Sequence, residues 1–207
     1  SRLLARKLAY RYLDTGAMYR AITYLALEEG IDIHDTEEIV KLSKKIEMQI
    51  TPPDENHISH IIINGRDVTD RLRTKEVDLN VSTVAKNKAI RELMTEMQRN
   101  IASSGNIIMD GRDIGTRVLP DADYKFFITA SLEERARRRW KELREKGLEV
   151  SLAEIEKEIA ERDREDSTRE LAPLVKAEDA ILIDTSNLSI QEVLDKLISY
   201  IKDEGNV

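Results

Sequence analysis

Strands and helices alternate in the second half of the sequence, and the same four-residue signal marks the starts of three helices. The segments SLEE (131–134), SLAE (151–154) and SIQE (189–192) each place a serine three residues before a glutamate, the pattern of a capping box. Two apolar segments typical of buried strands, KFFITA (125–130) and AILID (180–184), precede the first and third of these signals. This alternation predicts an α/β fold with a mostly parallel sheet.

The first half of the sequence predicts more elements of this kind and one insertion. Helices are expected over 2–9, 17–29, from about Thr36 and over 87–103, and strands over 11–14 and 106–110. Between Glu47 and Thr69, a pair of prolines (52–53), an apolar run (58–63) and an Asn64-Gly65 turn predict a small antiparallel sheet. We therefore expect one α/β domain with a modest β insertion.

Composition narrows the class of protein. The 207 residues include 41% hydrophobic and 35% charged residues, which suits one packed domain, and they contain neither a membrane-spanning run nor a secretory signal. We expect a cytoplasmic protein. The absence of cysteine and the three scattered histidines argue against zinc, so any metal should be oxygen-bound Mg²⁺. A net charge of −7 argues against broad nucleic-acid binding but not against binding of small anions.

Residues 151–169 carry charges in phase with an apolar helix face. The stripe that begins at Leu152 continues into Arg162, and Asp166 and Arg169 follow at i+4 and i+7. One interpretation is an exposed ladder of ion pairs within the helix. The other is a site in which two buried arginines and an aspartate face a phosphate. The residues alone leave both interpretations open.

A second cluster, DGRDIGT (110–116), follows the predicted strand IIMD. Ligands of parallel α/β sheets bind beyond the carboxyl ends of the strands. Arg112 offers a guanidinium for phosphate, and Asp110 or Asp113 can hold a metal, a water or a base edge. A structural turn explains the glycines equally well, but it does not explain two acids around an arginine, so we favour a functional loop.

The helix that follows Ser131 contains three consecutive arginines, 137–139. Most of its charged side chains should be solvated, although two helices joined by REKGLEV with a single glycine would also suit a movable lid over a triphosphate. His57 and His60 alternate with apolar positions and have no acidic partner nearby in the sequence, so we assign them no role.

Four motifs together resemble, in order and spacing, the bacterial cytidylate (CMP) kinases, which are P-loop nucleoside monophosphate kinases. The motifs are LDTGAMYRA (13–21), LRTKEV (72–77), IIMDGRDIGT (107–116) and ERDREDSTR (161–169) followed by LAPLVKAEDA (171–180). The resemblance extends from Ser1 to about Tyr200. It implies a three-layer α/β P-loop kinase fold with a five-stranded parallel sheet, a small antiparallel β insert and a helical lid.

The same resemblance implies one kinase unit over residues 1–207. Its core would comprise about 1–35, 84–130 and 171–207, its monophosphate-binding insert about 36–83 and its lid about 131–170. The implied reaction transfers the γ-phosphoryl group of ATP to CMP or dCMP with Mg²⁺, and it asks for positioning and charge neutralisation rather than a covalent nucleophile. We expect a monomer that acts on these small molecules, without nucleic-acid or membrane partners.

The resemblance also implies roles for individual residues, and it assigns no metal ligand. The catalytic set is Arg112, Asp113, Arg162 and Arg169; the substrate-binding set is Asp14, Thr15, Arg20, Arg73, Ser82, Arg91 and Asp166; the lid residues for ATP are Arg137 and Arg139. Arg20 would grip the monophosphate, while Ser82, Arg91 and Asp113 would lie nearest the cytosine. Arg162 with Asp166 would hold the ribose.

One departure from the family pattern is the missing N-terminal motif. Members of the family begin with a strand and a GxxxxGK[ST] loop that cradles the ATP phosphates, and the 207 residues contain neither. Ser1 aligns within the helix that follows this loop. We expect that these segments are missing from the given sequence rather than lost in nature, and that the 207 residues alone are inactive.

A binding module for a nucleoside monophosphate, without catalysis, is the alternative function. A P-loop kinase for a non-nucleotide alcohol is disfavoured by the insert and the charged helix.

Overall fold

The structure, a computed structural model, describes residues 1–51, 54 and 59–203. The chain divides into two compact units, Ser1–Ile114 and Gly115–Val207, and each unit is described by itself. Within the described ranges, no helix combines the length and the apolar character that a membrane span requires.

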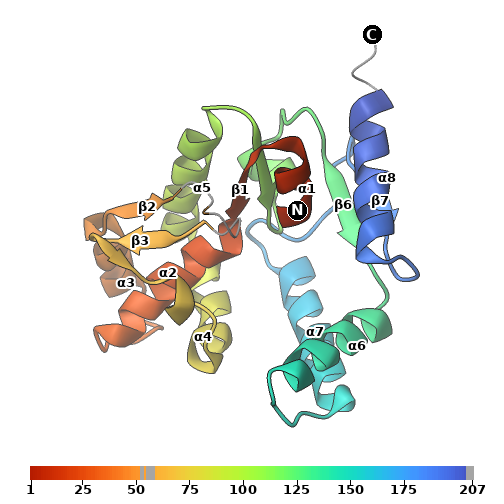
Figure 1. The fold of residues 1–207 in the computed structure, drawn as a ribbon. Helices are drawn as coiled ribbons and strands as arrows, with labels where there is room; N and C mark the ends of the chain where they lie inside the picture. Colours follow the sequence, from red (N-terminus) through yellow and green to blue (C-terminus); the bar gives the residue numbers. More distant parts are fainter. Residues whose placement is uncertain (52–53, 55–58, 204–207) are drawn as a thin grey trace. The chain divides into compact units, whose positions relative to one another are not determined.

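The first unit combines a parallel strand pair, a small antiparallel sheet and the helices packed around them (Figure 1). Its elements are α1 (Arg2–Leu8), β1 (Arg11–Asp14), α2 (Thr15–Glu28), α3 (Thr36–Lys45), β2 (Met48–Ile50), β3 (Ile61–Ile63), β4 (Arg66–Asp67), η1 (Thr69–Arg71), α4 (Lys75–Lys86), α5 (Lys88–Ala102) and β5 (Ile107–Asp110). Strands β1 and β5 pair in parallel, with Asp14 opposite Asp110 at their carboxyl ends. This register brings two carboxylates to the edge at which parallel α/β sheets bind ligands.

The antiparallel insertion is confirmed as a three-stranded sheet in the order β2-β3-β4. Asn64 and Gly65 both have positive φ, 50° and 78°, as a two-residue hairpin turn between β3 and β4 requires. The prolines at 52–53, His57 and the first residue of the predicted apolar run, Ile58, lie outside the described residues.

Helices α2 and α5 supply much of the core of the first unit. Met18 and Ile22 of α2 and Ile90 and Met94 of α5 are fully buried, which is the pattern of two amphipathic helices that share one core. Helix α2 begins at Thr15, two residues earlier than predicted, because the side chain of Asp14 caps it.

Helix α4 is not among the predicted elements, although its pattern is regular. Val77, Val81 and Val84 are buried at i, i+4 and i+7, and Thr74 caps the helix by accepting a hydrogen bond from the backbone N–H of Val77. The LRTKEV motif thus leads directly into a helix.

The second unit pairs two parallel strands and adds three long helices among its described residues. Its elements are β6 (Phe126–Thr129), α6 (Leu132–Glu145), α7 (Leu152–Thr168), β7 (Ile181–Asp184) and α8 (Ile190–Asp203), preceded by a π-helical turn, η2 (Ile114–Val118). The two strands pair from Phe126 opposite Ile181 to Thr129 opposite Asp184. Helices α6 and α7 pack against each other (Figure 1). The predicted strands and helices of this half are confirmed.

The three predicted capping boxes differ in completeness. Ser151 with Glu154 and Ser189 with Glu192 form both reciprocal hydrogen bonds. Ser131 accepts from the backbone N–H of Glu134, but the carboxylate of Glu134 accepts from arginines of the next turn instead of reaching back. The prediction of a full box at this helix was therefore wrong, because ion pairing competes for the glutamate.

Candidate functional site at the ends of the parallel strands

The carboxyl ends of β1 and β5 form a polar corner in the first unit. Oδ1 of Asp14 caps α2, and Tyr12 donates its hydroxyl proton to Oδ2 of Asp110 over 2.9 Å. Thr15 Oγ1 donates to the backbone carbonyl of Asp110 over 2.7 Å. Burial, and secondly the charge of Asp14, raise the pKa of Asp110 above its ordinary value. Two carboxylates held so close in a partly buried corner favour a cation or a polarised ligand there.

The close approach of these elements depends on Gly111. A Cβ atom at this position would lie 2.4 Å from Thr15 Oγ1 and 2.9 Å from Cδ1 of Ile114. The DGRD motif therefore needs glycine at this position for a steric reason. Because Gly111 has no side chain, the Thr15 hydroxyl can reach the carbonyl of Asp110.

Each predicted substrate-binding arginine of the first unit forms an ion pair with an aspartate. The pairs are Arg20–Asp78 (3.1 Å), Arg73–Asp14 (2.7 Å) and Arg91–Asp113 (2.5 Å). Their members come from β1, α2, α4, α5, the loop after β5 and the segment before α4, so this part of the site is assembled from segments far apart in sequence.

Arg91 and Asp113 form the most deeply buried of these pairs, with side chains 3% and 9% exposed. Arg91 also donates from Nη1 to the carbonyl of Ala85, and its guanidinium carbon lies 5.6 Å from the centre of the Tyr19 ring. Ser82 lies on α4 one turn before Ala85 and is partly buried. The predicted cytosine-binding residues Arg91 and Asp113 are thus brought together.

Arg112 of the same loop has an exposed side chain, unlike Asp113 beside it. An exposed guanidinium next to a buried acid suits a contact with a ligand that arrives from solvent.

Helix α7 of the second unit carries the charged face for which two interpretations are open, an exposed ladder of ion pairs and a buried phosphate site. Its charged residues are less buried than the phosphate site requires. Arg169 pairs with Asp166 over 3.3 Å and donates from Nε to the carbonyl of Ala172, and both members of the pair are largely buried. Arg162, however, lies on the exposed part of α7. Of the two arginines that the phosphate-site interpretation would bury, the structure largely buries Arg169 and leaves Arg162 exposed. Helix α7 also ends at Thr168, so Arg169 extends from its end.

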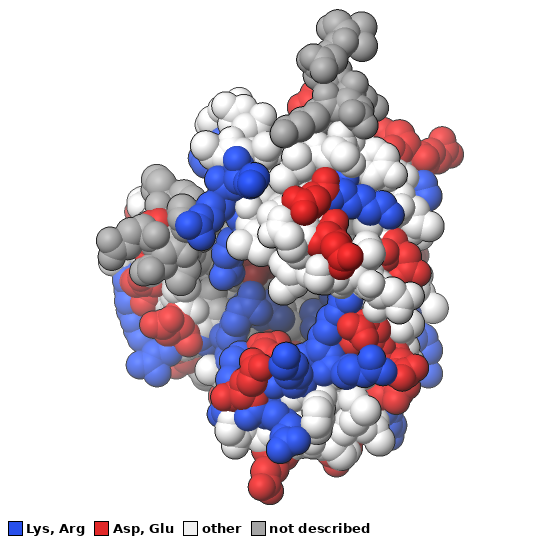
Figure 2. Space-filling model, turned by 45° about the vertical axis from the view of Figure 1, so that its right-hand side comes forward, with Lys and Arg blue, Asp and Glu red and all other residues white. Residues whose placement is uncertain are grey.

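The three consecutive arginines of α6 have different surroundings. Arg137 pairs with glutamates one turn earlier and Arg139 with Glu142, so both lie in exposed pairs within the helix. At the bottom of the view in Figure 2, where α6 and α7 are drawn, positive and negative side chains are intermixed. This surface is well solvated, as predicted for most of the charges.

Arg138 is an exception to that prediction. It donates from Nη2 to the carbonyl of Thr185 over 2.6 Å and from Nη1 to the Thr185 hydroxyl over 3.2 Å. Thr185 in turn donates its hydroxyl proton to the carbonyl of Thr129. Arg138 therefore anchors α6 to the ends of β6 and β7.

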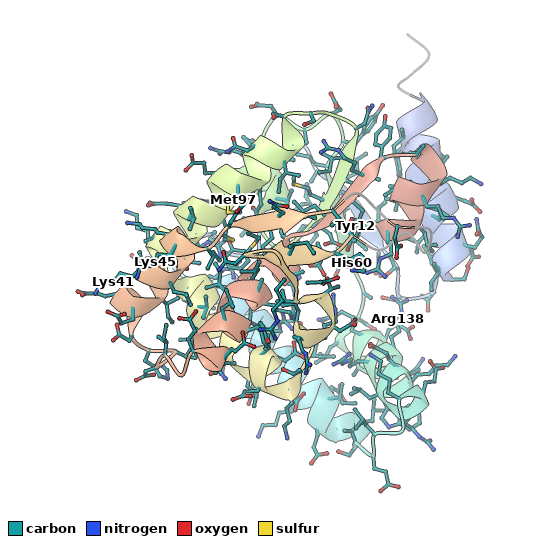
Figure 3. The ribbon with its side chains drawn as sticks, turned by 60° about the vertical axis from the view of Figure 1, so that its left-hand side comes forward. Tyr12, Lys41, Lys45, His60, Met97 and Arg138 are labelled. Atoms are coloured by element: carbon teal, nitrogen blue, oxygen red, sulfur yellow. The ribbon has the colours of Figure 1, made fainter. Side chains whose placement is uncertain are left out.

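His60, to which the sequence analysis assigns no role, has two acidic partners in the structure. His60 directly precedes β3 (Figure 3). Its Nδ1 lies 2.8 Å from Asp67 and its Nε2 lies 3.5 Å from Asp54. These hydrogen bonds, with that to Asp67 the stronger, raise the pKa of His60 above 6.5. Asp67 is brought near by the antiparallel pairing of β3 with β4, which sequence spacing alone did not reveal.

The predicted site residues thus fall into two groups, one on each unit. The first unit carries Asp14, Thr15, Arg20, Arg73, Ser82, Arg91, Arg112 and Asp113, and the second carries Arg137, Arg139, Arg162, Asp166 and Arg169. Sequence reasoning missed Asp78, Tyr12 and Arg138. Asp78 had one readable signal, an acid in the first turn of a helix with a regular valine pattern.

Mixed α/β architecture with parallel strand pairs and a corner of paired arginines and aspartates is consistent with a P-loop kinase fold. The sequence model of the family described as cytidylate kinase matches residues 1–203. The cytidylate kinase of Carboxydothermus hydrogenoformans is 49% identical over the whole chain and 92% of its own length. Those of Shouchella clausii and Bacillus subtilis are 50% and 46% identical, over 97% and 99% of this chain and 88% and 91% of their own lengths. The chain belongs to the cytidylate kinase family.

Proposed function

We propose that the protein transfers the γ-phosphoryl group of ATP to CMP or dCMP and releases ADP with CDP or dCDP. The observation that carries the cytosine assignment is the buried Arg91–Asp113 pair. Cytosine presents one amine donor and two acceptors, which a carboxylate and a guanidinium match, and Ser82 would add a hydroxyl. A base with a different arrangement of donors and acceptors would match these groups less well, which costs affinity.

The remaining residues of the first unit suit the phosphate and sugar of the acceptor. Arg20 and Arg73 would grip the monophosphate. Because Thr15 donates its proton to the carbonyl of Asp110, its oxygen is oriented to accept a hydrogen bond from a substrate hydroxyl.

Charge neutralisation during the transfer is assigned to Arg112, Arg162 and Arg169. Phosphoryl transfer needs positioning and electrostatic stabilisation of the transferred group, and guanidinium groups provide both. Asp166 would orient the acceptor ribose together with Arg162, while Arg137 and Arg139 would approach ATP. In this scheme residues 36–83 form the monophosphate-binding insert and residues 131–170 the lid.

Mg²⁺ would enter with ATP, and the donor set of the strand corner fits it. Asp14 and Asp110 lie opposite each other, and the repulsion that helps to raise the pKa of Asp110 would be relieved by a cation. Asp14 already accepts from Arg73 and from the backbone N–H of Ala17, so Asp110 is the better ligand of the two. Asp113 is less suited, because its partner Arg91 is buried with it. The described residues contain no group of three or more acidic or histidine ligands, but Mg²⁺ normally takes one or two carboxylates and completes its shell with phosphates and water. Bound there, Mg²⁺ would neutralise the phosphate charge.

Kinetic assays of the full-length protein, including any residues that precede Ser1, test the proposal. CMP and dCMP should be phosphorylated far faster than AMP or GMP, and Arg91→Ala should remove most of that activity. Arg66→Ala, which removes an exposed arginine paired with Glu28, is the matched control and should retain it. Equal turnover of AMP would refute the cytosine assignment. CMP binding by calorimetry that is lost in Arg91→Ala, without any turnover by the unaltered protein, would favour the non-catalytic binding module.

A further inference from the structure

Arg20 is held by an aspartate that no motif in the sequence singles out. Its Nε and Nη2 both donate to Oδ1 of Asp78, over 3.2 and 3.1 Å. The Arg20 side chain is only 11% exposed and that of Asp78 is 40% exposed. A guanidinium this buried requires a nearby anion, and Asp78 of α4 supplies one.

The opposite edge of the same guanidinium faces the polar corner. A Cβ atom on Gly16 would lie 3.1 Å from Arg20 Nη1 and 3.1 Å from Oδ1 of Asp14. Nη1 therefore lies over the first turn of α2, beside the end of β1. Asp78 binds Arg20 along the edge of Nε and Nη2, and Nη1 lies on the side of the polar corner.

A second ion pair connects the same two segments, with the acid now on the α2 side and the base on the α4 side. Asp14, at the start of α2, accepts from Arg73, which lies just before α4. The α2 segment thus contributes an acid and a base, and the α4 segment contributes the complementary base and acid. Two crossed pairs restrict the sliding of α4 along α2 and so fix where Asp78 lies relative to Arg20.

We propose that Asp78 is a positioning residue that orients Arg20 toward the phosphate of the nucleoside monophosphate. This inference rests on the proposed function, since it assumes that Arg20 binds that phosphate. The main alternative is that Asp78 competes with the phosphate for Arg20. The geometry favours positioning, because Asp78 uses the Nε edge and Nη1 lies on the other side.

Asp78→Ala in the full-length protein tests the idea. We expect the KM for CMP and the Kd for CMP by calorimetry to rise about tenfold, the scale of one lost charge-assisted contact, with kcat within about twofold. The Kd for cytidine, which lacks the phosphate, should not change. Asp78→Asn keeps an oxygen acceptor at the same place and should restore part of the affinity.

Glu76→Ala is the matched control, because it removes another exposed acid from the first turn of α4. It should leave both affinities unchanged. Tighter CMP binding by Asp78→Ala would show that Asp78 competes with the phosphate, and an unchanged Kd would show that it does not act on Arg20; either result overturns the inference. Equal weakening of cytidine and CMP would indicate a structural role and would also overturn it. If the unaltered protein neither binds nor phosphorylates CMP, the proposed function itself fails, which is a separate result.

Discussion

The Asp113 carboxylate lies 2.5 Å from Nη2 of Arg91, and almost no part of either side chain reaches solvent. A buried charge that loses its partner is costly, whereas two apolar side chains of similar volume in the same space are not. The pair should therefore affect stability and the base recognition that we propose in different ways, and substitutions can separate the two effects.

We expect Asp113→Ala to lower the free energy of unfolding by about 3–5 kcal/mol, because it leaves the Arg91 charge buried and unpaired. The double variant Arg91→Met with Asp113→Leu should recover most of that loss but should not bind CMP. Urea unfolding and calorimetry measure the two effects. Glu38→Ala, which breaks an exposed pair with Lys41, should cost less than about 1 kcal/mol. A double variant as unstable as the single one would contradict this account.

Gly111→Ala should be more harmful than Gly115→Ala. The added methyl group meets the Thr15 hydroxyl and the Ile114 side chain at position 111, whereas at position 115 it lies 3.3 Å from the flexible Lys125 side chain. We expect the first variant to lose about 1–3 kcal/mol of unfolding free energy and the second to lose less. Thermal unfolding of both variants compares them, and equal costs would count against a tight β5–α2 corner.

The stability of the protein should depend on pH through His60. Its folded-state pKa is raised above 6.5, mainly by Asp67 and then by Asp54, so protonated His60 stabilises the folded state. That stabilisation is fully present below pH 6.5 and is lost as the pH rises through the higher folded-state pKa. Urea unfolding from about pH 6 to about pH 9 should therefore show a decline that His60→Gln removes. His34→Gln is the control, and a decline that persists unchanged in His60→Gln would refute the assignment.

The neighbouring arginines of α6 should differ in their effect on stability. Arg138→Ala removes two hydrogen bonds to Thr185 and should cost about 1 kcal/mol, since the side chain is partly exposed. Arg137→Ala removes only exposed pairs within the helix and should cost less than about 0.5 kcal/mol. Chemical unfolding of the two variants in parallel gives the comparison. If Arg137→Ala were the more damaging, the proposed anchoring of α6 by Arg138 would be wrong.

Local patterns were sufficient to predict most elements of the fold. The apolar strands KFFITA and AILID, the serine caps and the Asn64-Gly65 turn each act over a few residues, so their structural consequences can be read directly. Helix α4 is the exception: it is not among the predicted elements, although the spacing of its valines is regular.

The ion pairs of the candidate site could not be predicted from spacing. The partner of Arg20 lies on the helix that was missed, and the partner of His60 depends on strand pairing. Arg138 looks like its two neighbours in sequence and differs only through its tertiary contact with Thr185. Local sequence determines the helix face of a side chain, but long-range packing determines its partner.

The contacts of the polar corner also bear on the order of folding. Arg20 and Asp78 are 58 positions apart, Arg73 and Asp14 are 59 apart, and Thr15 and Asp110 are 95 apart, whereas Arg91 and Asp113 are 22 apart. Closing a long loop costs more chain entropy than closing a short one, so contacts distant in sequence tend to form late. The Arg91–Asp113 pair is therefore expected to form before the longer-range contacts of Arg20, Arg73 and Thr15. During synthesis on the ribosome, the parallel strand pair that frames that corner cannot close until the segment containing Asp110 has emerged.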